Sequence, residues 1–374
     1  MTRLGDVVAL LESWYPPELA DDWDAVGLVC GDPDTLVRRV LLAVDPVQAV
    51  ADEAVAGDAD LVVVHHPLFL RGTSSVAATT PKGRVVHTLL TNGCGLYAAH
   101  TNADAPTGGV SESMALTLGL VDIEPLQADP VADRDKLVAF VPVDAADKVR
   151  QAIAEAGAGA IGDYDACTFT SVGEGRFRPL PGANPTIGSV GDLETVEEVR
   201  IEAVLDRRLR RQVVAAMVAA HPYEEPAYDV VPLAALDDAT RGSGRVGRLT
   251  EPVPLSGFAA HVARALPETA HGVRVAGDPT ALVEKVALCG GAGDFLLDRA
   301  RAVGADVYVT SDLRHHPASE LREHPGAPAL VDVAHWAAEW TWLPTLRDQL
   351  ATELGDTVAV HVSTTNTDPW TFRV

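Results

Sequence analysis

Regular alternation of strands with helices is the feature that most constrains the fold of this chain. VRRVLLAV at 37–44 predicts a strand, the segment after it predicts a helix, and LVVVHHP predicts a buried strand that ends at Pro67. The alternation continues to about 104 and returns after Gly247. Such a pattern predicts a sheet with helices on its faces. Because a strand–glycine–helix pattern occurs in both parts, we predict an α/β core made of two related halves.

A different pattern separates these two parts. Two successive strand–helix–strand segments begin near Lys136 and near Val196. Together they predict a β-α-β-β-α-β unit of the ferredoxin-like type, which closes on itself as an α+β domain. We therefore predict a core formed by 1–132 and 246–374, with an insertion domain at 133–245.

Charge and composition restrict the classes of partner. The chain has 374 residues and a formal net charge of -24, which disfavours nucleic acid and anionic membranes and attracts cations. No apolar run reaches the length of a membrane span, and the N-terminal segment lacks the layout of a signal peptide. The four cysteines form no C-x-x-C pair, so any metal site must use histidine and carboxylate side chains. We expect a cytoplasmic protein with free thiols.

Three predicted elements end in residues that can bind metals. His65 and His66 follow a strand and precede a proline, where two imidazoles can surround one open site, although a pair of ordinary loop histidines fits as well. Asp104 follows a strand in a loop, where an aspartate is also a common turn former. His335 and Glu339 share one face of a predicted helix, and the apolar residues between them fit a solvated helix face poorly.

Taken together, these five residues favour a metal centre. Ligand sites in open α/β sheets form beyond the carboxyl ends of strands, and all five lie at or after such ends. Three imidazoles and two carboxylates suit two divalent transition-metal ions, such as zinc, iron, manganese or cobalt. A carboxylate can bridge two such ions, which can share a hydroxide.

Other side chains are candidates for supporting roles. His100 and His316 could move protons, and Arg71 and Arg314 could attract an anionic substrate. The motif CGGAGD at 289–294 could cradle a phosphate on backbone N–H groups, or it could be a tight turn that allows close packing. It lacks the lysine and hydroxyl residue of a P-loop.

Six motifs occur in an order that resembles the Nif-three-like family, also called GTP cyclohydrolase I type 2 homologues. They are DDWDAVGLVCGDP, HHPLF, HTNAD, CGGAG, GADVYVTSDLRHH and DVAHWAAEW. The resemblance implies that His65, His66, Asp104, His335 and Glu339 hold two metal ions. It also implies a ring-shaped hexamer and an unsettled activity, to which the name GTP cyclohydrolase has been attached.

This chain departs from the family pattern at two places. Ala103 stands where the family has leucine before the aspartate, and Ser311 and His315 change the motif that is usually TGDIKYH. Neither change removes a ligand. The segment AAHPYEEPAYDVVPL makes the insertion similar to PII-like or CutA-like domains, which bind small ligands or form trimers in other proteins.

Two functional hypotheses follow. The first is a metal-dependent hydrolase, GTP cyclohydrolase-like by resemblance, acting on an unknown small molecule. The alternative is a non-enzymatic metal-binding or regulatory adaptor. Trp336, Trp340 and Trp342 offer more apolar surface than one helix face usually needs, so part of it could lie between subunits of a homo-oligomer.

Overall fold

The computed structural model describes residues 1–130, 133–234 and 237–374. It divides the chain into two compact units, which we call the core (1–129 and 238–374) and the insert (130–237). The predicted boundary at 132 lies outside the described residues. The predicted boundary at 245 falls inside strand β10 (Asp237–Pro254), whose Arg245 pairs with Leu288 of the core, so the residues before it belong to a core strand.

The first sheet of the core contains five strands in the order β1-β4-β3-β2-β15. Strands β2, β3, β4 and β15 are parallel, and β1 runs antiparallel to β4 at the edge. Their bounds are β1 (Gly27–Cys30), β2 (Arg39–Ala43), β3 (Leu61–Val64), β4 (Gly95–Ala98) and β15 (Ala359–Val362). The inner strands β3 and β4 are buried along their whole length, as expected for parallel strands covered on both faces.

The second sheet contains six strands in the order β11-β14-β13-β12-β10-β5. Strands β12, β13 and β14 are parallel, while β11 and β10 run antiparallel to their neighbours β14 and β12. The remaining bounds are β5 (Val121–Pro130), β11 (Arg274–Ala276), β12 (Leu282–Ala292), β13 (Val307–Ser311) and β14 (Ala329–Val333).

The two sheets share one internal plan, as the repeated sequence pattern predicts. The order β1-β4-β3-β2 corresponds to β11-β14-β13-β12, with three parallel strands and an antiparallel first strand beside the last. The core is therefore a mixed α/β fold of two related halves.

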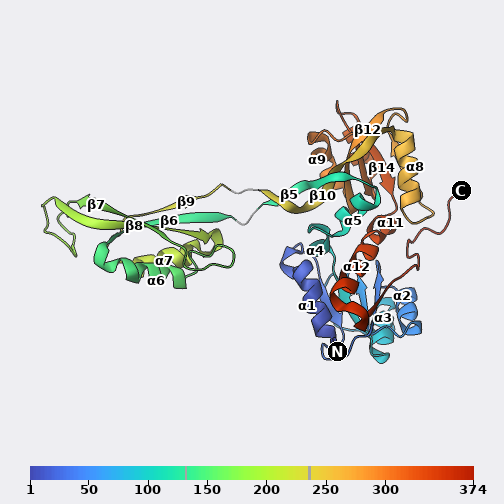
Figure 1. The fold of residues 1–374 in the computed structure, drawn as a ribbon, viewed down its shortest axis with the longest axis horizontal. Helices are drawn as coiled ribbons and strands as arrows, with labels where there is room; N and C mark the ends of the chain where they lie inside the picture. The colour runs from blue at the N-terminus through green and yellow to red at the C-terminus, as the bar shows by residue number, and fades with distance from the viewer. Residues whose placement is uncertain (131–132, 235–236) are drawn as a thin grey trace. The chain divides into compact units, whose positions relative to one another are not determined.

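Helices fill the space between the sheets and cover their outer faces. A central apolar cluster joins one face of each sheet to α1, α5, α8, α11 and α12 (Figure 1). Helices α2 and α3 cover the outer face of the first sheet, and α9 covers that of the second. The bounds are α1 (Leu4–Trp14), α2 (Gln48–Ala56), α3 (Pro81–Thr91), α4 (Thr101–Asp104), α5 (Val110–Thr117), α8 (Leu255–Ala265), α9 (Leu297–Ala302) and α10 (His315–Arg322).

The long helix predicted after β14 is interrupted. It consists of α11 (His335–Trp340) and α12 (Trp342–Leu354), which meet at Thr341. Pro344 has no N–H to bond to the carbonyl four residues earlier, and its ring crowds that carbonyl. At the junction, the Thr341 hydroxyl donates to the Ala338 carbonyl at 2.7 Å.

The insert has the predicted β-α-β-β-α-β order, and its four strands form one antiparallel sheet in the order β7-β8-β6-β9. This is the strand order of a ferredoxin-like unit. Its helices and inner sheet face enclose their own apolar cluster. The bounds are β6 (Arg134–Pro142), α6 (Ala146–Glu155), β7 (Phe169–Phe177), β8 (Glu194–Asp206), α7 (Arg210–Ala220) and β9 (Tyr228–Pro232).

Three further sequence expectations can be compared with the fold. All four cysteines are free thiols. Within the described ranges, no helix combines the length and apolar character needed to cross a membrane. Trp336 and Trp342 are buried in the central cluster of their own chain and so offer no surface to another subunit, whereas Trp340 is only partly buried.

Removing the insert is expected to leave a folded core. β5 and β10 are neighbours in one sheet, and near their outer ends Arg241 pairs with Asp129 at 2.9 Å. Replacing 130–237 by an Asn-Gly hairpin turn should therefore join adjacent chain ends at little entropic cost. Circular dichroism and metal content of the shortened protein test this. Insoluble or metal-free products from several different turns would show that the core depends on the insert.

The insert should lose stability in acid through one buried carboxylate. Asp135 is fully buried, and its carboxylate binds Arg210 at 2.6 Å and Arg207 at 3.2 Å. The hydrogen bond from Arg210 lowers the pKa of Asp135, and Arg207 adds to this effect. Because its pKa is lowered on folding, Asp135 stabilises the folded state at pH values above its ordinary pKa of about 3.9. This contribution to the free energy of unfolding disappears as the pH falls toward the pKa in the folded state.

Thermal unfolding of Asp135→Asn and of the unchanged protein between about pH 5 and pH 3 measures this contribution. The variant should be less stable at the upper end of the range and should lose less stability on acidification. Parallel pH profiles for the two proteins would contradict the role assigned to Asp135.

Candidate metal centre

The centre is built where the carboxyl ends of strands from the two sheets of the core face each other. His65 and His66 directly follow β3, and their backbone N–H groups still bond to carbonyls of Ala43 and Val44. Asp104 ends α4, just after β4, and α11 carries the remaining pair, His335 and Glu339, just after β14. The structure thus brings together all five residues predicted to be ligands.

Glu339 lies at the middle of this cluster. Its Oε1 atom is 2.8 Å from His335 Nε2 and 3.5 Å from His65 Nε2, and its Oε2 atom is 3.0 Å from His66 Nε2. Although Glu339 is almost completely buried, its Oε2 atom receives no hydrogen bond of good geometry from the described residues. A buried carboxylate oxygen without a donor is costly unless a cation balances it.

The far side of each imidazole is held by an acceptor. His65 Nδ1 donates to the Ala99 carbonyl at 2.9 Å, and the Nδ1 atoms of His66 and His335 lie 2.7 Å from carboxylate oxygens of Asp45 and Asp312. Carbonyl and carboxylate oxygens only accept, so Nδ1 must carry a proton in each ring. The Nε2 atoms are therefore oriented toward the cluster, as in ligating histidines held by outer partners.

His100 completes a group of imidazoles. Its ring centroid is 5.1 Å from that of His65 and 5.5 Å from that of His66, and ligand atoms of the three residues lie within 4.8 Å of one another. Asp24 fixes His100 through Nδ1 at 2.9 Å and also accepts from the Thr101 hydroxyl at 2.6 Å. Burial opposes ionisation of Asp24, but these hydrogen bonds hold its pKa well below its usual range.

Electrostatics in the cluster are strongly coupled. Burial disfavours the charged imidazoles, but Glu339 with Asp45 raises the pKa of His66 to about 10, and Glu339 with Asp312 raises that of His335 to about 11. Burial and the Glu339 charge raise the pKa of Asp104 to about 8. Burial favours the neutral form of Glu339, but the surrounding imidazoles hold its pKa well below its usual range. Protons on the imidazoles thus balance the negative charge of Glu339, at ring nitrogens that could bind metal cations in place of these protons.

The glycine motif at 289–294 serves close packing against this cluster. A side chain at Gly291, whose φ is +69°, would place its Cβ 2.6 Å from Glu339 Oε1. A Cβ at Gly293 would lie 2.4 Å from the Thr310 hydroxyl. These contacts favour the second sequence interpretation, a tight turn that lets backbone approach the ligands, over a phosphate cradle.

Several supporting residues were not found from the sequence. Asp24, Asp45 and Asp312 orient histidines, and the available signal was that Asp45 lies two residues after β2 and Asp312 directly follows β13. Arg245 is also buried, and its guanidinium donates to carbonyls of Gly242, Gly244, Ala105 and Pro106 at 2.7–2.9 Å. It therefore fixes the loop that follows Asp104.

Three of the residues predicted to have supporting roles, His316, Arg71 and Arg314, take no part in these contacts. Arg314 pairs with Asp294 and is largely exposed, and His316 stacks edge-on against His315 in α10. Among the described residues, no hydrogen bond or ion pair connects His316, Arg71 or Arg314 to the five central residues. Their roles remain predictions.

A two-half α/β core with a cluster of imidazoles and carboxylates defines the class: a protein whose histidine and glutamate side chains could hold a metal ion. Residues 2–369 match the family model described as Duf34/NIF3 (NGG1p interacting factor 3). The chain belongs to this family, in agreement with the resemblance found in its motifs.

Similar proteins extend over almost the whole chain. A "GTP cyclohydrolase 1 type 2 homolog" of Mycobacterium tuberculosis is 50% identical over 98% of this chain and 96% of its own length. The Bacillus subtilis protein of the same name is 38% identical, with 98% and 97% covered. Among solved structures, a Bacillus cereus protein related to NIF3 is 39% identical, covers 100% of this chain and 99% of its own, and has a TM-score of 0.68. A Staphylococcus aureus protein reaches a TM-score of 0.78 at 27% identity, with 100% and 99% covered.

Proposed function

We propose that this chain holds two divalent transition-metal ions and hydrolyses a small, nucleotide-like substrate. The observation that carries the proposal is the position of Glu339, a buried carboxylate with Nε2 atoms of three histidines within 3.5 Å. One of its oxygens receives no hydrogen bond of good geometry from the described residues. Imidazole and carboxylate donors suit zinc, iron, manganese or cobalt. The residues present therefore fit the metals that the family resemblance implies.

The ligands divide into two overlapping sets. His66, His335 and Glu339 offer ligand atoms within 4.8 Å of one another and would hold one ion. His65 Nε2 lies 3.8 Å from Asp104 Oδ1 and 3.5 Å from Glu339 Oε1, so these residues would hold the second. Glu339 belongs to both sets and would bridge them.

The surrounding residues would support hydrolysis. Two such ions lower the pKa of a bound water and polarise an electrophilic centre of the substrate. Asp45, Asp312 and the Ala99 carbonyl would keep the ligand rings oriented, and His100 would exchange a proton at Nε2 because Asp24 occupies its Nδ1. The name of the relatives supports a purine nucleotide as the first substrate to test, since opening a purine ring requires addition of water.

Metal analysis combined with a substrate screen tests this proposal. Protein purified without chelator should contain about two transition-metal ions per chain, as a two-metal site requires. Turnover of GTP or of another member of a nucleotide panel should be lost in Asp104→Ala and retained in a control variant, His87→Ala, at an exposed position of α3. Full metal loading without turnover would favour the non-enzymatic alternative, a metal-binding or regulatory adaptor. Absence of metal after reconstitution would overturn the site.

Assembly and the nature of the insert complete the proposal. The family resemblance supports a homohexamer and a PII-like or CutA-like insert, and closed symmetry is the rule for soluble homo-oligomers. Since the chain carries a net charge of -24, association should weaken at low salt, where repulsion is less screened. Light scattering that shows a monomer at micromolar concentration and moderate salt would contradict the hexamer.

A further inference from the structure

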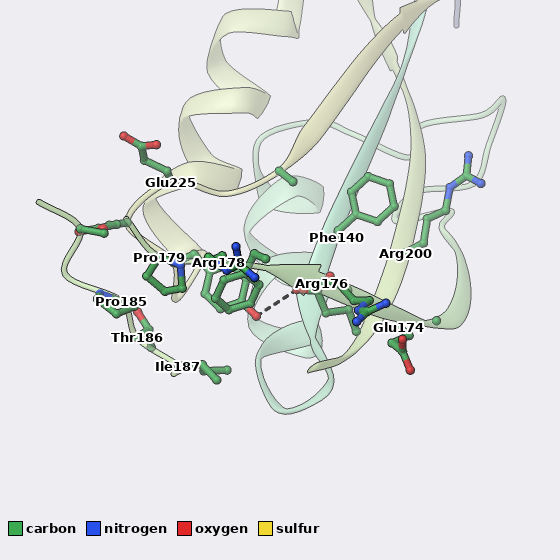
Figure 2. Close-up of a pocket in the computed structure, with 18 of the residues that line it drawn as sticks. Phe140, Glu174, Arg176, Arg178, Pro179, Pro185, Thr186, Ile187, Arg200 and Glu225 are labelled. Carbon is green, nitrogen blue, oxygen red and sulfur yellow. Dashed lines mark hydrogen bonds between the residues drawn. The ribbon is translucent and has the colours of Figure 1, made fainter. Parts of the chain in front are cut away.

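One face of the sheet in the insert is free of the two helices of that unit. Leu137, Ala139 and Ile201 point into the apolar cluster with α6 and α7. Phe140 and Arg200, which alternate with these residues and are cross-strand partners, lie on the opposite face. A cavity of about 710 Å³ lies on this second face, within the insert (Figure 2). This volume is in the usual range for small-molecule sites.

Two glycines of β7 keep the floor of the cavity open. A Cβ built on Gly173 would meet no atom within 4 Å, and the backbone there does not have a positive φ. A Cβ on Gly175 would lie 2.1 Å from a carboxylate oxygen of Glu198. Side chains at either position would occupy the cavity or displace Glu198, so the cavity depends on their absence.

The apolar walls of the cavity are held together by hydrogen bonds. Pro179, Leu180, Pro185 and Ile187 line one side, and Phe177 and Tyr223 stand together with ring centroids 5.8 Å apart. The Asn184 N–H donates to Glu224 at 2.8 Å, and the Thr186 hydroxyl donates to the Pro222 carbonyl at 2.7 Å. These bonds fasten the loop after β7 to the loop before β9, so the walls are preformed.

Several of the charged side chains around the cavity already have a hydrogen-bond or ion-pair partner. Glu198 accepts from the Tyr223 hydroxyl at 3.0 Å, Glu224 accepts from Asn184, and Arg200 pairs with Glu202 at 2.9 Å. Glu225 points away from the other labelled side chains, and Glu174 is drawn next to Arg176 (Figure 2).

Two guanidinium groups at the cavity have no ion-pair partner among the described residues. Arg176 and Arg178 line the cavity, and neither forms an ion pair within the part of the chain that the structure describes. Figure 2 shows them near the centre of the drawn side chains. A guanidinium group presents a planar fork of donors that matches carboxylate, phosphate and sulfonate groups.

We propose that this cavity binds a small organic anion with a flat apolar body. The body lies against Phe140, Phe177 and Tyr223, where aromatic rings offer apolar surface, and the anionic group meets Arg176 and Arg178. This site lies wholly within the insert and does not depend on the function proposed for the metal centre.

Titration of the full-length protein with the fluorescent aryl sulfonate 8-anilinonaphthalene-1-sulfonate tests the proposal. We expect saturable binding with one site per chain. Phenyl phosphate and phenylacetate should compete, because each combines a ring with an anion, whereas inorganic phosphate and benzyl alcohol, which each lack one of these parts, should not. Competition by inorganic phosphate alone would overturn the assignment of an apolar body.

Two variants locate the site. Gly173→Leu fills the cavity and should abolish binding, and the double change Arg176→Gln with Arg178→Gln should weaken binding about tenfold or more, the usual effect of losing charged hydrogen bonds. The matched controls are Gly257→Leu, at an exposed position of α8 with nothing within 4 Å of its Cβ, and Arg211→Gln on α7.

The outcomes separate a built site from unspecific binding. Near-UV circular dichroism must first show that each variant is folded, because loosely packed proteins also bind this dye. If Gly173→Leu does not fold, the double variant Arg176→Gln with Arg178→Gln tests the proposed site by itself. Unsaturable binding, or binding that the arginine changes leave intact, would overturn the proposal. Equal weakening by Arg211→Gln would do so too, because it would reveal general charge attraction.

Discussion

Replacing Glu339 by glutamine is expected to remove both of the metal ions that we propose for the centre. Glutamine keeps the shape of the side chain but removes the charge and one anionic oxygen. Glu339 contacts Nε2 atoms of His65, His66 and His335, so both ligand sets share it. Loss of an outer partner of a ligand typically weakens metal binding about 10–100-fold, and loss of a bridging ligand should exceed this. Elemental analysis and competition with a chelator measure the effect.

Two comparisons give this prediction its specificity. His335→Ala removes a ligand from one set only, so it should lose one ion preferentially. Glu53→Gln makes the same chemical change at a carboxylate in α2 that accepts from the Ser363 and Thr365 hydroxyls, and it should keep both ions. Full occupancy in Glu339→Gln would refute the bridging role, and equal losses in all three variants would indicate general destabilisation.

Much of the core fold was predictable because its strands and helices have clear sequence periods. The apolar runs at β2, β3 and β13, separated by helical segments, predict parallel strands covered on both faces. The pattern does not say which strands pair, so it could not show that β3 and β14 belong to separate sheets whose carboxyl ends face each other. Pairing depends on contacts between residues far apart in the chain.

The same distinction explains the candidate site. His335 and Glu339 could be predicted because their spacing alone places them on one helix face. Asp24 could not, since it meets His100 across 76 residues and the local sequence there resembles an acidic loop. Arg245 was assigned to the insert because its neighbours form a strand that could belong to either unit. Only the register of β10 against β12 places it in the core.

The tryptophans show where apolar patterns are ambiguous. Part of the surface of Trp336, Trp340 and Trp342 was expected to lie between subunits, because a single helix seldom needs so much apolar area. The actual reason is that α11 and α12 lie between two sheets and are covered on several sides. A sequence period measures how much of a helix is apolar, but it does not identify what covers that surface.

Replacing Trp342 by alanine should have the largest effect on stability. Trp342 is fully buried and has the largest side chain that is so enclosed. Its ring packs edge-to-face on Tyr15 and on the metal-centre residue His65, both with centroids 5.6 Å away, and its Nε1 donates to the Tyr15 hydroxyl at 3.1 Å. Truncating a buried tryptophan to alanine costs about 3–5 kcal/mol, because transfer energy is lost and a cavity remains.

Chemical denaturation in the presence of chelator measures this loss without a contribution from metal binding. Tryptophan fluorescence reports on the core alone, because all six tryptophans lie outside 130–237. The midpoint should fall at an unchanged slope, as expected when stability changes and the surface exposed on unfolding does not. Trp342→Phe keeps a ring but loses the donor, so its cost should be smaller, on the order of 1–3 kcal/mol.

The matched control is Trp370→Ala, at a position 68% exposed, which should stay within about 0.5 kcal/mol of the unchanged protein. Trp342→Ala should also weaken metal binding, because His65 loses the ring that supports it while Ala99 still holds its Nδ1. A stability loss below about 1 kcal/mol would mean that the core closes around the missing ring. In that case the packing around His65 and Tyr15 would not depend on the Trp342 ring.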